Sequence, residues 1–520
     1  MRSSPHRHAG CHDSSGTRSR ETGILAAAIL GSSMAFIDAT VVNVMLPELQ
    51  ASLAASVAQI QWVVEAYTLF LAALLLLGGA LGDRYGRRRI LTLGITLFTL
   101  ASLACALAPD ADSLITLRAL QGVGAALLIP GSLAIISVCF PHERRGRAIG
   151  LWSGFSAVAS GMGLVLGGLL IDLISWRAVF ALNLPVAAVT LGLLYRFVPE
   201  SARPAPHPPL DITGALLSVI ALGGLILGLI AASGSGFLDP GVLLPGAIGL
   251  LAMAFFIRHE RRCPSPMLAP HLFGSRTFRT VSLLTFLFYA ALGTFFFLLP
   301  MTLVQIHGFS ATAAGAATLP IIILMSLLSG RAGRLIDRYG ARRPLTIGPL
   351  IVAAGLGGLL LAGTEASYWH TFLPSIALMG AGMVTTVAPL TATVMASVAD
   401  SDAGTASGIN NAIARTAGLM GIALFGPVLY LVFRHALLER LAPLALPDSI
   451  RNALVTRLDR LAALPLPEHL SAEQALRLRQ LIEHSFVLGF DSVIIACMAL
   501  MMAASATAAI GLRPTTPDER

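Results

Sequence analysis

The sequence contains no lysine. All 35 of its basic residues are arginine, and only 12% of its 520 residues are charged. Soluble domains carry about 25% charged residues and are roughly 45–50% apolar. Here hydrophobic residues reach 55% and the mean hydropathy is +0.79. So little charge with so much apolar side chain excludes an ordinary water-soluble domain and indicates an integral membrane protein.

Catalytic and nucleotide-binding motifs are also absent. No GxxxxGK[ST] phosphate loop, HExxH motif or GxSxG nucleophile elbow occurs, which argues against an ATP-driven pump and a membrane enzyme. We therefore expect no enzyme activity and no cofactor other than a proton gradient. Five cysteines show no paired or metal-ligand spacing, so we expect neither disulfides nor a metal site: Cys11, Cys105, Cys139, Cys263 and Cys497.

What the sequence does contain is long apolar runs. A bilayer core needs about 20 apolar residues per helix. Fourteen runs are candidates for such helices, and the weakest is the short 241–257 run: 23–46, 58–80, 89–108, 113–138, 147–170, 176–198, 212–232, 241–257, 280–303, 313–332, 346–363, 371–395, 405–433 and 485–512.

The net charge of +8 is explained by where the arginines lie. With fourteen helices and both ends on one side, 25 arginines fall in the tails and in the loops after even-numbered helices. This asymmetry is the positive-inside rule, so both termini are expected in the cytoplasm of a cell-membrane protein. We therefore attribute the basic balance to topology in the lipid bilayer, with no nucleic-acid partner.

One string occurs twice. GALGDRYGRRRILTLG (79–94) returns as GRLIDRYGARRPLTIG (333–348), and the two match at 11 of 16 positions. Each copy joins two runs on the cytoplasmic side, which predicts a parallel duplication. Eight helices separate the copies, whereas two six-helix repeats would place them six apart. The expected fold is all-α: fourteen transmembrane helices in two six-helix bundles related by a pseudo-twofold axis, plus two inserted helices.

The predicted division of the chain follows from this repeat. It comprises a disordered cytoplasmic tail, an N-terminal bundle, a linker with two extra helices, a cytoplasmic connector, a C-terminal bundle and a short cytoplasmic tail: 1–21, 22–200, 201–258, 259–279, 280–512 and 513–520. Within the C-terminal bundle, segment 434–484 holds seven arginines and six acids and predicts amphipathic helices outside the membrane. It is either a passive cap or a substrate gate.

The repeated loop has a mechanical interpretation. Gly79 allows close helix approach, Gly86 permits a tight reversal, and Asp83 can pair with the arginines or with the opposite half. Such a pair would hold the cytoplasmic side shut; the alternative is an ordinary basic loop that sets topology. The expected gate residues are Gly79, Asp83, Arg84, Gly86, Arg87 and Arg88, with Asp337, Arg338, Gly340 and Arg342 in the second copy.

This loop resembles the signature of the major facilitator superfamily. IDATVVNVMLPEL (37–49) is similar to the first-helix motif of its fourteen-helix drug/proton antiporter branch, the EmrB/QacA type, and LITLRALQGVGAA (114–126) matches the fourth-helix motif. SWRAVFALNLPV (175–186) and GTASGINNAIARTAG (404–418) also recur in that branch. The resemblance covers roughly residues 22–433 and the last helix.

The fifth-helix motif departs from that branch. GMGLVLGG (161–168) has Gly163-Leu164 where the branch has Gly-Pro. Its glycines still allow close packing: Gly161, Gly163, Gly167 and Gly168. In the branch, the Pro kink is thought to favour exchange of substrate for protons and to block proton leak. With Leu164 in its place, symport remains an alternative to antiport.

Three ionisable residues inside the apolar runs point to mechanism, because such residues are costly in lipid. Asp38, Glu65 and Arg118 are expected at similar depth in one bundle. A carboxylate whose access to water and to Arg118 alternates would load and release a proton. We expect Asp38 to carry this coupling, with Glu65 as the second acid. The alternative is a permanently paired structural cluster.

Other polar residues predict a substrate cavity: Asn43, Trp62, Tyr67, Gln121, Asn410, Asn411 and Arg415. Arg415 either contacts an anionic substrate group or bonds the neighbouring asparagines, and Asp491 is a candidate counter-ion. The resemblance implies a secondary active transporter that exports hydrophobic or amphipathic drugs or antibiotics by proton antiport through alternating access. The alternatives are an exporter or symporter of a small endogenous metabolite, or a non-transporting sensor or scaffold. We expect a monomer.

Overall fold

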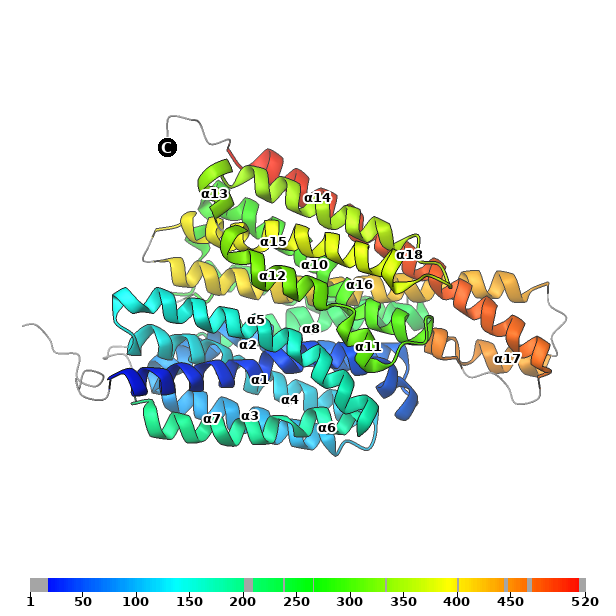
Figure 1. Cartoon of the computed structure of the whole chain (residues 1–520), viewed down its shortest axis with the longest axis horizontal. Coiled ribbons are helices and arrows are strands. Elements are labelled where there is room, and N and C mark those ends of the chain that lie inside the picture. Colours follow the sequence, from blue (N-terminus) through cyan, green and yellow to red (C-terminus); the bar gives the residue numbers. More distant parts are fainter. Residues whose placement is uncertain are drawn as a thin grey trace, which may run out of the picture.

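The computed structural model is helical throughout the part of the chain that it describes (Figure 1). The described residues are 17–200, 209–236, 239–264, 266–332, 334–399, 402–443, 448–464 and 470–513. Their helices are α1 (Thr17–Ser52), α2 (Val57–Tyr85), α3 (Arg87–Ala106), α4 (Ala111–Cys139), α5 (His142–Leu173), α6 (Trp176–Ala181), α7 (Asn183–Phe197), α8 (Ile212–Ser235), α9 (Pro240–Glu260), η1 (Pro270–Gly274), α10 (Arg276–Gln305), α11 (Ala311–Ala316), α12 (Leu319–Ala332), α13 (Arg334–Tyr339), α14 (Arg342–Leu359), η2 (Tyr368–Phe372), α15 (Leu373–Ala396), α16 (Ala403–Leu441), α17 (Asp448–Val455), η4 (Leu458–Ala463) and α18 (Ala472–Gly511).

Twelve spans among the described residues are long and apolar enough to cross a membrane. The expected runs 147–170 and 346–363 are not among them. The first lies in α5, whose described apolar portion is the shorter stretch Gly161–Leu173. The second lies in α14, which is 18 residues long and begins with two arginines. Among the described residues, length and hydropathy therefore identify twelve spans, and the fourteen that the sequence predicts are not confirmed.

The helices form two groups with α8 between them. In Figure 1, α1 to α7 form one group and α10 to α18 form the other. Helix α8 packs against α2 of the first group and α16 of the second, whereas α9 packs mainly against α8. Helix α1 begins and α18 ends at the same end of the molecule, called the terminal end below, and the end near α17 is called the distal end (Figure 1).

Glycines let α2, α3 and α4 approach closely. A Cβ atom at Gly78 would collide with the carbonyl oxygen of Ala126, and one at Gly124 would lie 2.6 Å from the backbone nitrogen of Phe98. The sequence assigned this close approach to Gly79. That assignment is wrong, because a Cβ at Gly79 would meet only the side chain of Pro130, at an ordinary 3.6 Å.

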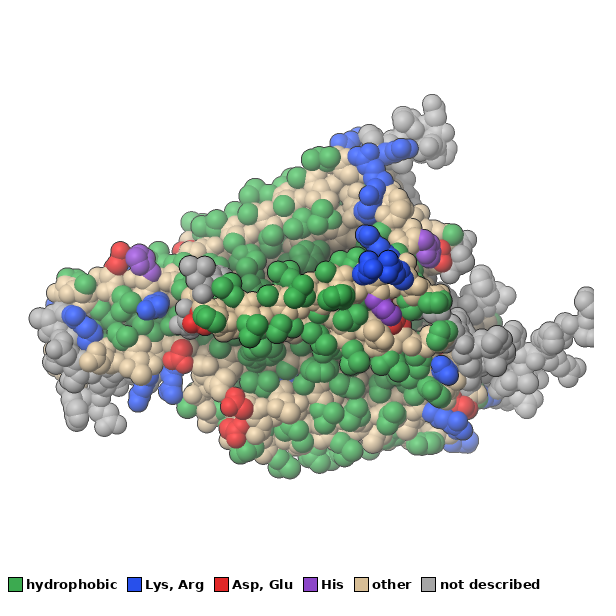
Figure 2. All heavy atoms as spheres, turned by 180° about the vertical axis from the view of Figure 1, so that it is seen from behind, with side chains coloured by type: hydrophobic (Ala, Val, Ile, Leu, Met, Phe, Trp, Pro, Cys, Tyr) green, Lys and Arg blue, Asp and Glu red, His purple; other side chains and the backbone are tan. Residues whose placement is uncertain are grey.

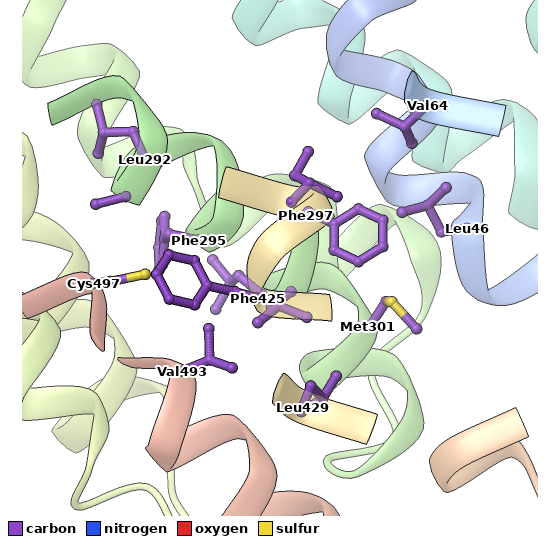
Figure 3. Close-up of a cluster of buried hydrophobic side chains, with 14 of the residues drawn as sticks. Leu46, Val64, Leu292, Phe295, Phe297, Met301, Phe425, Leu429, Val493 and Cys497 are labelled. Carbon is purple, nitrogen blue, oxygen red and sulfur yellow. The ribbon is translucent and has the colours of Figure 1, made fainter. Parts of the chain in front are cut away.

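The two groups meet in an apolar cluster near the distal end. Leu46 of α1 and Val64 of α2 approach Phe297 and Met301 of α10, while Phe425 of α16 and Cys497 of α18 complete the cluster (Figure 3). All of these side chains are buried. Gln305 Nε2 at the end of α10 also donates a hydrogen bond to Gln50 Oε1 of α1, at 2.9 Å.

Segment 434–484 adds to this contact. Helix α16 continues to Leu441 and α18 begins at Ala472, so both extend into the segment that the sequence placed outside the membrane. Between them lie the short helices α17 and η4. Gln50 donates to the carbonyl of Arg460 in η4 at 3.1 Å. Because η4 also packs against α2, α16 and α18, the segment bridges the two groups.

The outer surface suits a bilayer. Hydrophobic side chains cover the middle of the face in Figure 2, and charged side chains gather toward the two ends. Leu250, Phe255 and Leu327 are among the many large apolar residues that are exposed. In water such a surface would be costly, whereas lipid tails match it.

We predict opposite effects for two glycines one turn apart on α2. Gly78→Ala introduces the collision with Ala126 and should destabilise the protein by about 1–3 kcal/mol. Gly82→Ala is the matched control, since no atom lies within 4 Å of its Cβ position, and alanine is favoured over glycine in helices by about 1 kcal/mol. Thermal unfolding followed by size exclusion in detergent measures both. Equal melting temperatures would contradict the packing described.

Candidate functional site

A fully buried ion pair joins α1 to α4. Arg118 Nη1 on α4 donates to Asp38 Oδ2 on α1, and both side chains are 1% exposed. Gln121 closes the arrangement: its Nε2 donates to Asp38 Oδ1 at 2.8 Å and its Oε1 accepts from Arg118 Nη1 at 2.7 Å. Residues 118 and 121 are three apart and so share one face of α4. The sequence placed Asp38 and Arg118 together, and the structure brings them into contact.

Helix α2 completes the surroundings of this pair. Arg118 Nε donates to the carbonyl oxygen of Val63 at 3.1 Å. The Arg118 guanidinium lies over the ring of Tyr67, 4.3 Å from its centroid, which is a cation–π geometry. The Tyr67 hydroxyl in turn donates to the carbonyl of Ala35 at 3.2 Å. Arg118 therefore fastens α1, α2 and α4 to one another.

Glu65, which the sequence placed at a similar depth, has no contact with the Asp38–Arg118 pair among the described interactions. It is fully buried, and neither of its carboxyl oxygens has a hydrogen-bond partner in the described part of the chain. Gln61, one turn earlier on the same face of α2, donates to the carbonyl of Ile422 on α16 at 3.4 Å. One turn later, Leu69 packs with residues of α8 and α16. Glu65 thus lies on the face of α2 that meets the other group of helices, away from Asp38 and Arg118.

The expected cavity residues divide into two sets. Tyr67 and Gln121 belong to the Arg118 cluster. Asn410 of α16 accepts a hydrogen bond from Thr285 of α10 at 2.7 Å, whereas the exposed Asn411 donates to the carbonyl of Ser407. Trp62 packs against the apolar cluster of α2, α8 and α16, and Asn43 is half-buried on α1.

Arg415 on α16 is a cation inside the second group. No hydrogen bond or ion pair joins its side chain to another described residue, so neither the asparagine contact nor the Asp491 counter-ion expected from the sequence is present there. Its guanidinium lies in electrostatic range of Tyr67 on α2 and Tyr289 on α10. Tyr67 of the Arg118 cluster is therefore also near the cation of the other group.

The first repeated loop turns at Gly86, whose φ of 106° strongly favours glycine, as predicted. Arg87 Nη2 donates to Asp83 Oδ1 at 2.6 Å across this turn. Glu200, just after α7, accepts from the backbone nitrogens of Arg88 and Arg89 at 3.2 Å each. Sequence reasoning missed Glu200, the last residue of the predicted N-terminal bundle, although an acid at a helix end on the same side was a usable signal.

The second loop turns at Gly340, where φ is 70°. Arg342 donates from Nε to the carbonyl of Ala509 near the end of α18, at 2.9 Å. The equivalent arginine of the first loop, Arg88, donates from Nη1 to the carbonyl of Val198 at the end of α7, at 3.2 Å. Each loop is thus fastened to the last long helix of its own group. Arg338 lies over Tyr339, Arg84 lies over Tyr85, and the side chain of Asp337 is outside the described residues.

The glycines of α5 face two sides. Val41 of α1 occupies the space beside Gly167, and a Cβ at Gly163 would lie 3.1 Å from the Cα of Ile37. Gly168 lies against the backbone of Thr312 in α11, and Gly161 against Ile322 in α12. The motif therefore packs α5 on α1 and on the opposite group. Leu164 is buried at this contact, so the close approach does not need the missing proline.

Similar proteins carry names from drug resistance. The multidrug resistance protein Stp of Mycobacterium tuberculosis is 34% identical over 84% of this chain and 80% of its own length. The puromycin resistance protein pur8 of Streptomyces alboniger is 37% identical over 78% of this chain and 80% of its own. The tetracenomycin C resistance and export protein of Streptomyces glaucescens is 30% identical over 97% and 94%.

Solved structures share the fold. A bacterial homolog of the human lysosomal transporter Spinster, in an inward-facing and occupied conformation, has a TM-score of 0.63 at 19% identity, covering 97% of this chain and 100% of that one. The peptide transporter POT in complex with sulfate has a TM-score of 0.58 at 12% identity, covering 95% and 97%. Residues 28–422 match the Major Facilitator Superfamily. The chain is therefore a multi-pass membrane protein that belongs to the Major Facilitator Superfamily.

Proposed function

We propose that the protein exports amphipathic drugs or antibiotics from the cell by proton antiport. The names of its relatives support drugs and antibiotics as cargo. The two groups of helices are suited to open alternately to either face of the membrane, with the region around Tyr67, near Arg118 and Arg415, exposed in turn. The protein would act in the cell membrane as a monomer, with both termini in the cytoplasm and without a nucleic-acid partner.

The observation that carries proton coupling is the contrast between two buried acids. Asp38 has hydrogen bonds to both oxygens and a cation beside it, which suits an anion. Glu65 has neither, and an isolated buried carboxylate is far more costly than its neutral acid. In this arrangement Glu65 would hold a proton. Separation of α2 from α16 would admit water to Glu65 and allow the proton to leave.

The two acids then have different roles in the cycle. Glu65 loads a proton when the helices close around it and releases it when they part. Asp38 and Arg118 form either a permanent clamp or a second switch that opens when substrate approaches. Arg415 supplies a cation that an acidic or hydrogen-bond-accepting part of the cargo would meet, since its guanidinium has no bonded partner among the described residues.

We further propose the fourteen-helix drug/proton antiporter branch. Helix α5 has 32 residues, or about 48 Å at 1.5 Å per residue, and packs along α1. Helix α14 packs along α15 and α18. If both cross the bilayer, they add to the twelve candidate spans, and α8 with α9 form the inserted pair between residues 201 and 258. Leu164 is the reason to keep a metabolite symporter as the second candidate.

The transport test compares cells of an efflux-deficient host with and without the protein. Ethidium, puromycin and tetracenomycin C form the first panel.

In vesicles, addition of an exported compound should release protons, detected with a pH-sensitive dye. Glu65→Gln should reduce proton release at least tenfold, because an amide cannot carry the proton. Glu48→Gln, an exposed carboxylate on α1, is the matched control and should transport normally. Full proton release by Glu65→Gln would refute the assignment, and no effect of any compound would favour a sensor or scaffold.

A second prediction concerns the buried pair. Asp38→Asn and Arg118→Gln should each destabilise the protein by about 3–5 kcal/mol, because each leaves its partner buried and uncompensated. The double variant should lose less than the sum of the two. Asp112→Asn is the control on α4: its Oδ1 accepts an exposed hydrogen bond from Gln59 that asparagine can still accept, so a change of at most about 1 kcal/mol is expected. Thermal unfolding of the purified proteins measures the cycle, and strict additivity would mean that the two residues do not interact.

The helix count yields a third prediction. If α5 crosses the membrane, a reporter fused after Pro141 reports the cytoplasm and one fused after Ser175 reports the outside. Alkaline phosphatase and green fluorescent protein fusions distinguish the two sides. The same comparison at Tyr339 and Gly363 tests α14. Finding both members of a pair on one side would establish that the intervening helix does not span.

A further inference from the structure

We propose a metal site that binds a divalent transition-metal ion, best matched by Zn²⁺, where the ends of α8 and α9 meet. Its ligands are Asp211, His259, Glu260 and Cys263. The site lies apart from the Arg118 cluster and does not depend on which compound is transported.

Three donor groups come together at this point from two parts of the chain, and Glu260 lies beside them next to Asp211. Asp211 immediately precedes α8, His259 and Glu260 end α9, and Cys263 follows in the connector to α10. Ligand atoms of Asp211, His259 and Cys263 all lie within 4.8 Å of one another. His259 Nε2 is 2.7 Å from Asp211 Oδ1. The turn after α9 brings the thiol back, since the Cys263 nitrogen donates to the carbonyl of His259 at 2.8 Å.

Two of the carboxyl oxygens have no hydrogen-bond partner among the residues that the structure describes. Asp211 Oδ1 accepts from the Gly214 nitrogen at 2.8 Å, and Glu260 Oε2 accepts from the Leu268 nitrogen at 2.9 Å. The remaining oxygens, Asp211 Oδ2 and Glu260 Oε1, are buried and unpartnered. Both residues are more than nine-tenths buried, at 8% and 3% exposed. Two buried carboxyl oxygens without partners require a cation or a proton.

Gly214 provides the room for these oxygens. A Cβ there would collide with Asp211 Oδ2 and would lie 3.0 Å from Glu260 Oε1. The two unpartnered oxygens therefore share the space that the missing side chain of Gly214 leaves open.

The chemistry of the donor groups indicates which metal ion would bind. A thiolate and an imidazole favour zinc and related ions over Mg²⁺ or Ca²⁺, which prefer oxygen ligands. Zinc takes four ligands at about 2.0–2.3 Å in a tetrahedron, which places the ligand atoms roughly 3.3–3.7 Å apart. The atoms of Asp211, His259 and Cys263 now lie within 4.8 Å of one another, and small side-chain rotations would bring them to that spacing, with Glu260 turning in as the fourth ligand. Binding would release the thiol proton of Cys263 to solvent.

The surrounding charge is compatible with such an ion. Three anionic ligands and one neutral imidazole around Zn²⁺ leave a net charge of −1. Arg258, Arg261 and Arg262 line the adjacent surface hollow at the end of α9 and would offset it. The ion would tie α9, which packs mainly against α8, to the start of α8 and to the connector before α10.

The experiment measures metal bound by the full-length protein in detergent, purified without a histidine tag. The N-terminal residues His6, His8, Cys11 and His12 can also bind metal, so every protein compared carries Cys11→Ser. After equilibrium with micromolar free Zn²⁺, the reference protein should hold one more zinc ion than Cys263→Ser. Co²⁺ should give a thiolate charge-transfer band in the near ultraviolet that Cys263→Ser lacks. Zinc should raise the melting temperature of the reference protein and leave that of Cys263→Ser unchanged.

Two further variants separate the outcomes. His271→Ala, an exposed histidine in the same connector, should bind zinc like the reference protein. Glu260→Gln should weaken zinc binding at least tenfold. Equal zinc in the reference protein and Cys263→Ser would overturn the proposal. The proposal would also be overturned if neither of these two proteins held zinc and Glu260→Gln were at least as stable to heat as the reference protein. That result would mean that a proton alone joins the carboxyl groups of Asp211 and Glu260.

Discussion

A charged side chain inside an apolar layer needs an opposite charge and hydrogen-bond partners. The structure of the first group of helices depends on how Arg118 obtains them. Its guanidinium is shared among Asp38, Gln121 and a backbone carbonyl, with an aromatic ring beneath. Lipid offers no water to replace any of these partners. Helices α1, α2 and α4 are consequently held to one another by a bonded cluster as well as by packing. This makes the first group suited to move as a single body.

The two groups meet through contacts of a different kind. Where α5 approaches α11 and α12, glycines leave room for backbone contact, and where α1 and α2 approach α10, the contact is apolar (Figure 3). Such surfaces can separate without leaving a buried charge unpaired. Polar links between the groups are few among the described residues and include Gln50 to Gln305 and Asp172 to the backbone of α11. Strong bonds within a group and weaker ones between groups are what a rocking movement requires.

Local sequence predicted the features that depend on local chemistry. The duplicated loop, the turn at Gly86 and the nearness of Asp38 to Arg118 follow from motif, conformation and helix depth. The position of Glu65 did not follow, because depth along a helix does not say which face meets which neighbour. Glu200 and the Asp211 cluster were missed for a related reason: their partners are distant in sequence, and neither has a fixed spacing. Gly78 was missed because it lies one residue before the repeated string, and composition does not resolve a rotation of 100° about the helix axis.

The repeated loops carry the clearest trace of the duplication in three dimensions. Arg88 and Arg342 occupy the same position of the two copies, and each donates to a carbonyl at the end of the last long helix of its own group. Carbonyls at a helix end have no partner within the helix, and a cation there also matches the helix dipole. A general requirement for a basic loop would not by itself give both loops the same arginine-to-carbonyl contact. Each arginine thus fastens its loop to the last helix of its own group. Any contact with the other group would be additional to this one.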